Sequence, residues 1–178
     1  MKMAPFELPL DEIRQSLNTL RRPLRVAVLR SKNPFNVGSI IRVAHSFLAQ
    51  EILLVGDEPF YKKAAMGMDR YENLVYLPDE DALVTWARER RLPLVGFERE
   101  AATADLWTSP LPESCVLLFG SESDGLSEGL LAACDHVVAI PMAGINNSFP
   151  ITVAAGIGMA EWTRRHYGPR SGEGAASD

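Results

Sequence analysis

Six short apolar runs recur along the chain, separated by longer segments with helical patterns. The runs are nearly continuous in apolar residues, so both faces of each expected strand should be buried. Buried strands that alternate with helices are typical of a parallel sheet covered on both sides. The sequence therefore predicts one α/β domain with a mostly parallel sheet and helices on both faces. The expected strands are Leu24–Arg30, Glu51–Val55, Leu74–Leu77, Leu92–Phe97, Ser114–Phe119 and Val137–Ile140.

Helical patterns lie before, between and after these strands. In the clearest case, apolar residues from Val37 to Leu48 recur at helical spacing, with Asn36 as the expected N-cap. The closing helix is expected from Phe149 to His166, and Ser148 is a candidate for its N-cap. Shorter helices are expected over residues 10–20, from Asp79 to the arginines at 88–91, and over residues 126–133.

Charge is unevenly distributed along the 178 residues, whose net charge is −5. Residues 1–50 carry a net +5, whereas residues 51–135 carry a net −10. The net charge argues against a nucleic-acid partner, but such asymmetry can place a basic patch near one end of the fold. A solvated surface without a partner explains the same composition equally well.

Several common functional motifs are missing from the sequence. There is no GxGxxG after the first strand, no phosphate loop, no GxSxG and no HExxH. The three histidines are dispersed, so we expect no metal. Cys115 and Cys134 lie in or beside apolar runs without ligand spacing, which favours reduced thiols of a cytoplasmic protein. No run reaches the ~18 apolar residues of a membrane span, and the N-terminus is too polar for a secretory signal.

Two of the expected strands end in loops rich in glycine and polar residues. Ser114–Phe119 continues into GSESDGL, and Val137–Ile140 continues into PMAGINNSFP. Loops at the carboxyl ends of parallel strands are where α/β domains build small-molecule sites. We therefore expect the chemistry of the chain in these two loops.

Three blocks of sequence carry a resemblance to a known family. NPFNVGSIIRVAHSF, LLFGSESDGLS and IPMAGINNSFPITVAAGIGMAEW resemble the three motifs of the SpoU-type ribose 2′-O-methyltransferases, in the same order and spacing. These enzymes belong to the SPOUT superfamily, and the similarity covers most of residues 24–167. The resemblance implies a C-terminal trefoil knot, a homodimer, and methylation of tRNA or rRNA.

The resemblance also implies a cofactor, S-adenosylmethionine, and the residues that would bind it. Gly120, Ile140 and Phe149 match positions that contact the cofactor in the family. Phe97 at the end of the fourth strand and Met142 in the last loop are further candidates. Without the other motifs, Gly120 would be better explained as part of a turn and Ile140 as part of the core.

The catalytic candidates come from the same motif match. Asn36 and Arg42 fit the family pattern N-x-G-x-x-x-R, in which the arginine assists the ribose hydroxyl. Glu122 matches the family's G-x-E, and Ser148 matches a motif-three serine that lines the site. The competing interpretation of Arg42 is an arginine on a solvated helix face.

One departure from the family pattern leaves an alternative open. Many members have an asparagine in the last motif where this chain has Pro150. A non-catalytic or weakly active member that still binds RNA or cofactor is therefore the alternative hypothesis. An unrelated nucleotide-binding α/β enzyme is a third, disfavoured by the missing phosphate loop.

The expected organisation is an N-terminal extension (residues 1–22), a SPOUT methyltransferase domain (residues 23–168) and a disordered tail (residues 169–178). The dimer is expected to form through the closing helix. Its small residues would allow close approach, and Phe149, Met159 and Trp162 would supply apolar area for the interface.

Overall fold

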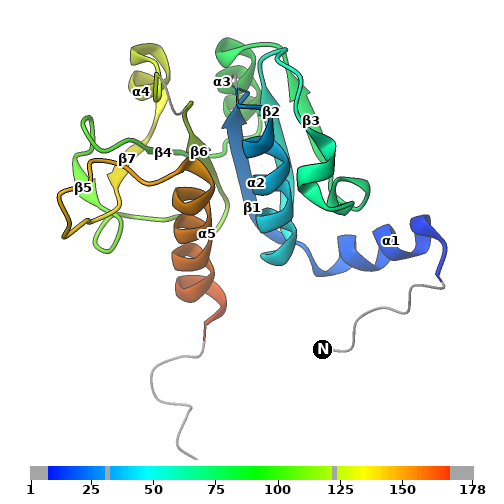
Figure 1. The fold of residues 1–178 in the computed structure, drawn as a ribbon. Helices are drawn as coiled ribbons and strands as arrows, with labels where there is room; N and C mark the ends of the chain where they lie inside the picture. Colours follow the sequence, from blue (N-terminus) through cyan, green and yellow to red (C-terminus); the bar gives the residue numbers. More distant parts are fainter. Residues whose placement is uncertain (1–7, 31–32, 122–123, 169–178) are drawn as a thin grey trace, which may run out of the picture.

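A seven-stranded parallel sheet forms the centre of this computed structural model, which describes residues 8–30, 33–121 and 124–168 (Figure 1). The expected tail, 169–178, and the first seven residues lie outside the described residues. The strands are β1 (Arg22–Leu29), β2 (Ala49–Val55), β3 (Leu74–Leu77), β4 (Leu94–Phe97), β5 (Ala104–Asp105), β6 (Cys115–Phe119) and β7 (His136–Ala139). The helices are α1 (Leu10–Leu20), α2 (Pro34–Ser46), α3 (Glu80–Glu89), α4 (Glu128–Ala133) and α5 (Ile151–Tyr167), with 3₁₀ turns η1 (Lys62–Ala65) and η2 (Met68–Arg70).

The strand order is β3-β2-β1-β6-β4-β7-β5, and every pairing between these strands is parallel. β1 lies inside the sheet, where Val26 is paired with Ile52 of β2 and Leu117 of β6. Because all strands run the same way, their carboxyl ends meet along one edge. The predicted parallel α/β sheet is confirmed.

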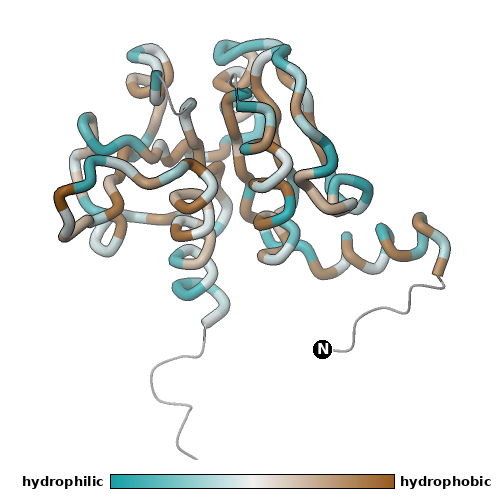
Figure 2. Tube along the Cα trace, viewed as in Figure 1, coloured by the Kyte–Doolittle hydropathy of each residue, from teal (hydrophilic) through white to brown (hydrophobic). Residues whose placement is uncertain are grey.

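Two apolar layers cover the faces of the sheet. α2 and α5 pack on one face, and the apolar layer between them and the sheet includes Ile40, Ile41 and Trp162. α3 and α4 pack on the other face, with Leu83 and Leu130. Apolar residues are concentrated in the strands and on the inner sides of the helices (Figure 2). The prediction of helices on both faces is therefore confirmed.

The starts of two helices differ from the sequence prediction. Asn33, not Asn36, is the N-cap of α2, and its side chain accepts from the N–H of Phe35 at 3.2 Å. Pro34 fills the first helical position, where its missing N–H costs no hydrogen bond. α5 begins at Ile151 with Pro150 as N-cap, so Ser148 does not cap it.

A buried ionic cluster fixes the junction between α1 and β1. Arg21 donates to Glu72 at 2.7 Å and to the carbonyls of Ala49 and Tyr71. The Nδ1 of His45, on α2, lies 2.7 Å from the same Glu72 carboxylate. None of the residues of α1 is itself buried, so this cluster and the hydrogen bond from Asn73 to Asn18 at 3.2 Å help to tie the helix to the body of the protein.

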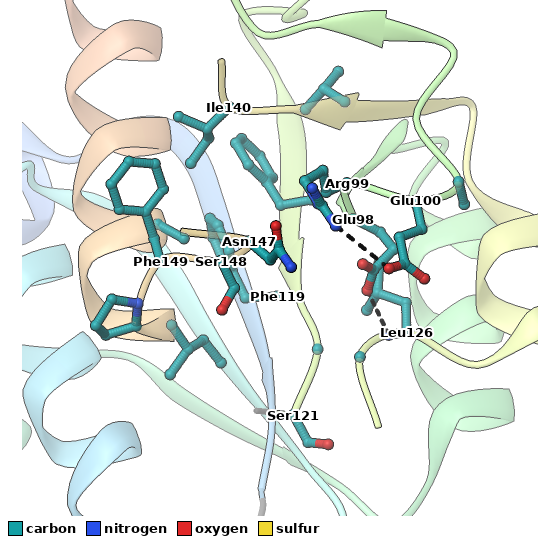
Figure 3. Close-up of a pocket in the computed structure, with 18 of the residues that line it drawn as sticks. Glu98, Arg99, Glu100, Phe119, Ser121, Leu126, Ile140, Asn147, Ser148 and Phe149 are labelled. Atoms are coloured by element: carbon teal, nitrogen blue, oxygen red, sulfur yellow. Dashed lines mark hydrogen bonds and ion pairs between the residues drawn. The ribbon is translucent and has the colours of Figure 1, made fainter. Parts of the chain in front are cut away.

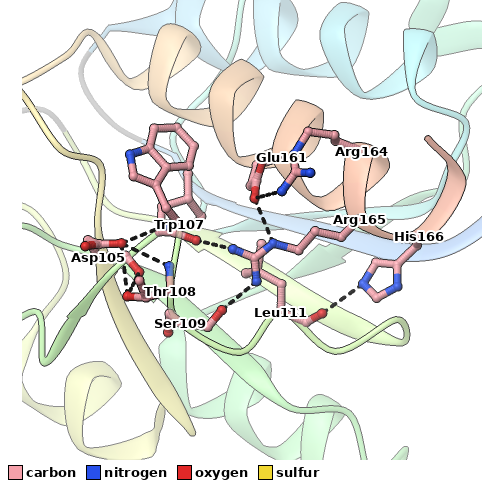
Figure 4. Close-up of polar contacts among 10 residues, drawn as sticks. Asp105, Trp107, Thr108, Ser109, Leu111, Glu161, Arg164, Arg165 and His166 are labelled. Atoms are coloured by element: carbon pink, nitrogen blue, oxygen red, sulfur yellow. Dashed lines mark hydrogen bonds and ion pairs between the residues drawn. The ribbon is translucent and has the colours of Figure 1, made fainter. Parts of the chain in front are cut away.

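The second half of α5 is held against the segment that follows β5 (Figure 4). Glu161 is buried and accepts hydrogen bonds from Arg164 at 2.7 Å and from Arg165 at 2.8 Å. Arg165 in turn donates to the carbonyls of Leu106 and Ser109. The hydrogen bond from Arg164 is the main reason that the pKa of Glu161 is lowered to about 2. This network orients α5 along the sheet.

Met159 and Trp162 lie inside the protein rather than on a free helix face. Both side chains are fully buried in the core between α5 and the sheet, and the Trp162 indole donates to the Pro112 carbonyl at 3.0 Å. The expectation that they supply area for a dimer interface is therefore wrong. A helical pattern indicates which residues share an apolar face, but it does not indicate which part of the protein packs against that face. Phe149 and Val153 do remain exposed.

Candidate functional site

A cavity of about 1030 Å³ lies at the carboxyl edge of the sheet (Figure 3). Its walls come from the segments that follow β4, β6 and β7 and from the first turn of α5. These segments are distant in sequence and meet because the strands that precede them are parallel neighbours in the sheet. Cavities of this size at this edge of an α/β sheet are typical of small-molecule sites.

All five residues expected to bind a cofactor line this cavity, and so does Ser148. The lining residues predicted from the sequence are Phe97, Gly120, Ile140, Met142, Phe149 and Ser148. The structure therefore brings the predicted positions together from three separate loops. Their roles stay predictions, because a shared cavity shows proximity and not which ligand is bound.

One wall of the cavity is apolar. The rings of Phe97 and Phe119 have centroids 4.6 Å apart, at the ends of adjacent strands β4 and β6. Gly158 of α5 lies directly against the Phe97 ring, and a Cβ there would be 2.7 Å from its Cζ. The absence of a side chain at Gly158 thus lets α5 close this wall. An apolar slot of this kind suits a flat aromatic group such as a purine.

A tight turn after β6 forms the second wall. The backbones of Ser121 and Gly125 exchange two hydrogen bonds of 3.2 and 3.0 Å. A Cβ on Gly120 would lie 2.3 Å from the Gly125 backbone, so only glycine fits there. Gly125 has φ +65°, a conformation that also favours glycine. Glu122, a predicted catalytic residue, lies outside the described residues.

Glu98 holds the turn in place from the neighbouring loop. Its Oε2 accepts from the N–H of Leu126 at 3.2 Å, and a Cβ on Gly125 would lie 2.4 Å from the same oxygen. The sequence analysis missed Glu98, although it directly follows the fourth strand just as Gly120 follows the fifth. The rule that polar residues at strand ends build sites could have found it.

The third wall is the segment between β7 and α5. Asn146 donates from its side chain to the Ser148 carbonyl at 3.3 Å, and Asn147 and Ser148 face the cavity (Figure 3). Pro150 also lines the cavity, and its carbonyl accepts from the N–H groups of Val153 and Ala154. The position at which the chain departs from the family pattern is therefore part of the site.

Arg42 and Asn36 are not among the described residues that line the cavity. Arg42 is exposed on α2, the helix that packs against α5, so its side chain can contact a partner molecule. Asn36 is buried, and its side-chain Nδ2 has no hydrogen-bond partner among the described residues. An unpaired buried donor is costly, so Asn36 is suited to bind a group that the protein itself does not supply.

None of the described helices is long and apolar enough to cross a membrane. Among the residues that the structure describes there is no cluster of three or more His, Cys, Asp or Glu side chains that could hold a metal ion.

The family model of the SpoU rRNA methylases matches residues 23–160, which include all three segments of the cavity wall. The chain belongs to the SpoU rRNA Methylase family. Among its relatives is a 23S rRNA (uridine(2479)-2′-O)-methyltransferase from Streptomyces viridochromogenes, 28% identical over 95% of this chain and 62% of the relative. The SpoU chain described here thus spans about three fifths of the length of that relative.

Solved structures of SpoU proteins share the fold. The SpoU methyltransferase AviRb from Streptomyces viridochromogenes, in complex with the cofactor AdoMet, has a TM-score of 0.74 and 29% identity, over 82% of this chain and 58% of AviRb. A structure described as giving insights into the 2-OH methylation of C/U34 on tRNA has a TM-score of 0.72 and 26% identity, over 80% of this chain and 95% of the other. The predicted SpoU-type resemblance is confirmed.

Proposed function

We propose that this SpoU-family chain transfers a methyl group from S-adenosylmethionine to a ribose 2′-hydroxyl of tRNA or rRNA. The observation that carries the proposal is the cavity, whose walls are built from the second and third motif blocks and from the loop after β4. Relatives named as 2′-O-methyltransferases, and a similar structure holding AdoMet, support it.

The residues of the cavity fit the chemistry of this cofactor. The slot formed by Phe97, Phe119 and Ile140 suits the adenine ring, and backbone groups around Gly120 can bond to its edge. Met142 and Phe149 would close the cavity from the third segment. Asn147, Ser148 and the Glu98 carboxylate supply acceptors and donors for the polar parts of the cofactor.

In the proposed reaction the ribose oxygen would form a bond to the methyl carbon as the carbon–sulfur bond breaks, the donor would become the neutral thioether S-adenosylhomocysteine, and the hydroxyl proton would pass to water. S-adenosylmethionine supplies an electrophilic methyl group on a sulfonium. Arg42 would stabilise the charge that develops on the ribose oxygen, since its side chain is exposed and can reach a bound RNA. Asn36, Glu122 and Ser148 would position the reacting groups.

The organisation of the protein is part of the proposal. It comprises the extension of residues 1–22, the methyltransferase domain of residues 23–168, the knotted C-terminal segment, a homodimer and a cytoplasmic location. Phe149 and Val153 support the dimer, because both remain exposed at the start of α5. A stable dimer would bury at least ~1,000 Å².

A methyl-transfer assay with labelled cofactor and bulk tRNA or rRNA tests the proposal. Arg42→Ala is expected to lower the rate by about a hundred-fold or more, as for other groups that stabilise developing charge. Cofactor affinity measured by calorimetry should stay within a few-fold, because Arg42 does not line the described cavity. Mass spectrometry of the nucleosides would then identify the modified ribose.

The alternative, a family member without turnover, is favoured by Pro150 alone. It predicts cofactor binding without methyl transfer to any RNA offered. Retention of the wild-type rate by Arg42→Ala would show that the catalytic assignment is wrong. Family membership removes the third hypothesis, an unrelated nucleotide-binding enzyme.

A further inference from the structure

Two aromatic rings are exposed together outside the cavity, where α2 meets η1. Phe35 on α2 is 55% exposed and Tyr61, directly before η1, is 42% exposed. Their ring centroids are 4.9 Å apart with an interplanar angle of 53°. Neither ring is needed to fill the core, and aromatic residues of this size are normally covered. An exposed aromatic pair requires an explanation.

The pair is held rigidly by the backbone. The N–H of Tyr61 donates to the Pro34 carbonyl at 2.8 Å. Gly38, one turn further along α2, lets η1 approach closely, since a Cβ there would lie 2.7 Å from Ala64 Cβ and 2.8 Å from the Tyr61 carbonyl oxygen. The relative placement of the two rings is therefore set by the fold and not by loose side chains.

Two lysines lie next to Tyr61 in the sequence, on the side away from the exposed Asp57 and Glu58. Lys62 and Lys63 follow Tyr61 directly, and both are exposed. Neither lysine forms an ion pair with any residue that the structure describes. Lysines are depleted in the centres of protein–protein interfaces, whereas unpaired lysines bind phosphates well. The chemistry of this surface thus favours a polyanion over a second copy of the chain.

The pair is also aligned with Arg42. Phe35 and Arg42 are seven residues apart on α2, so they lie on the same helix face, about 10 Å apart along the axis. Both are exposed, and Ser39 lies between them on the same stripe. The stripe runs between η1 and α5, which both pack against α2. It begins at the carboxyl edge of the sheet, where the cavity lies.

We propose that Phe35 and Tyr61 form a stacking platform for an unpaired base of the RNA substrate, with Lys62 and Lys63 binding its backbone. The proposal rests on the proposed function for the identity of the substrate. A base stacked at Phe35 would place neighbouring nucleotides at the carboxyl edge of the sheet, where the cavity lies. The platform therefore favours single-stranded segments, such as loops, over base-paired RNA.

RNA binding tests the platform without requiring methyl transfer. The probe is a fluorescein-labelled oligouridine, titrated with full-length protein and followed by fluorescence anisotropy. Phe35→Ala and Tyr61→Ala are each expected to weaken binding by about five-fold to a hundred-fold, the range for loss of one stacked base. Cofactor affinity and the melting temperature of both variants should stay close to those of the wild type.

Two control variants distinguish stacking from loss of structure. Tyr76→Ala removes a ring on β3 that is also 55% exposed, and it should leave RNA affinity unchanged. Phe35→Trp keeps an aromatic face and should retain binding, even if Phe35→Ala folds poorly. Replacing Lys62 and Lys63 by alanine should lower the slope of log affinity against log salt by about 0.7 for each phosphate that the protein no longer binds.

Unchanged RNA affinity in both Phe35→Ala and Tyr61→Ala would overturn the platform. So would dissociation of a dimer by these variants in light scattering, because the surface would then be an interface between copies. A wild-type protein that binds the oligonucleotide but methylates no RNA would refute the proposed function and leave the platform intact.

Discussion

The buried cluster around Glu72 allows a quantitative test of how the fold is held together. The side chains of Arg21 and Glu72 are 0% and 1% exposed and lie 2.7 Å apart. Glu72→Ala would leave the Arg21 guanidinium buried with two carbonyl acceptors but no counter-charge. Removing one partner of a buried ion pair typically costs about 3–5 kcal/mol.

For a domain of this size, each kcal/mol lowers the melting temperature by about 2–4 °C, so Glu72→Ala should lower it by about 6–20 °C. The measurement is thermal and urea unfolding at neutral pH, followed by circular dichroism. The matched control is Glu51→Ala, because its partner Arg25 lies 3.0 Å away and the two side chains are 17% and 26% exposed. This pair keeps contact with water, so we expect it to contribute less than the buried pair, on the order of 1 kcal/mol.

A double variant checks the physical cause. Replacing both Arg21 and Glu72 by methionine removes the unpaired guanidinium, so part of the lost stability should return, although His45 and the carbonyls of Ala49 and Tyr71 still lose a partner. Equal losses in Glu72→Ala and Glu51→Ala would refute the reasoning. So would a double variant less stable than Glu72→Ala, since the loss would then come from packing and not from an uncompensated charge.

Three further outcomes are expected. Because the folded-state pKa of Glu161 is lowered to about 2, its contribution to stability should be present at pH values above the ordinary carboxyl pKa and lost as the pH falls toward 2. In Glu161→Gln the free energy of unfolding should therefore depend less on pH over this acidic range. Burial raises the pKa of Cys115 to about 12 and of Cys134 to about 11, so iodoacetamide should label both thiols slowly in folded protein and quickly after denaturation, as followed by mass spectrometry. Pro150→Asn should preserve the fold and cofactor affinity, because asparagine is a favourable N-cap, and should raise methyl transfer; an unchanged rate would show that proline is adapted to this chain.

The sequence alone determined the layered architecture. Continuous apolar runs such as Ile52–Val55 can be buried on both faces only within a sheet that is covered on both sides, so these runs predict the α/β fold class. α1 was predicted with its observed bounds, because Pro9 precedes it and Pro23 follows it closely. The motif resemblance also picked out loop residues that the structure brings into one cavity.

The sequence did not determine the start of a helix where two nearby residues can both serve as its N-cap. Asn33 and Asn36 are both good N-caps, and Pro34 decides between them by favouring the first helical position. The short strand β5 and the 3₁₀ turns η1 and η2 were missed. β5 has only two residues and exists through its pairing with β7, which a local pattern does not contain.

Only the tertiary structure decided which residues meet across the chain. Glu98 and Leu126 are 28 positions apart, and the bond between them depends on the loops after β4 and β6 lying side by side. Trp162 is apolar in any arrangement, but packing against the sheet determines that it is core and not interface. Phe35 and Tyr61 likewise become a pair only because Gly38 lets η1 rest on α2. Local sequence patterns indicate secondary structure and the apolar face of each element. Contacts between distant segments depend on how the whole chain folds, which a short stretch of sequence does not contain.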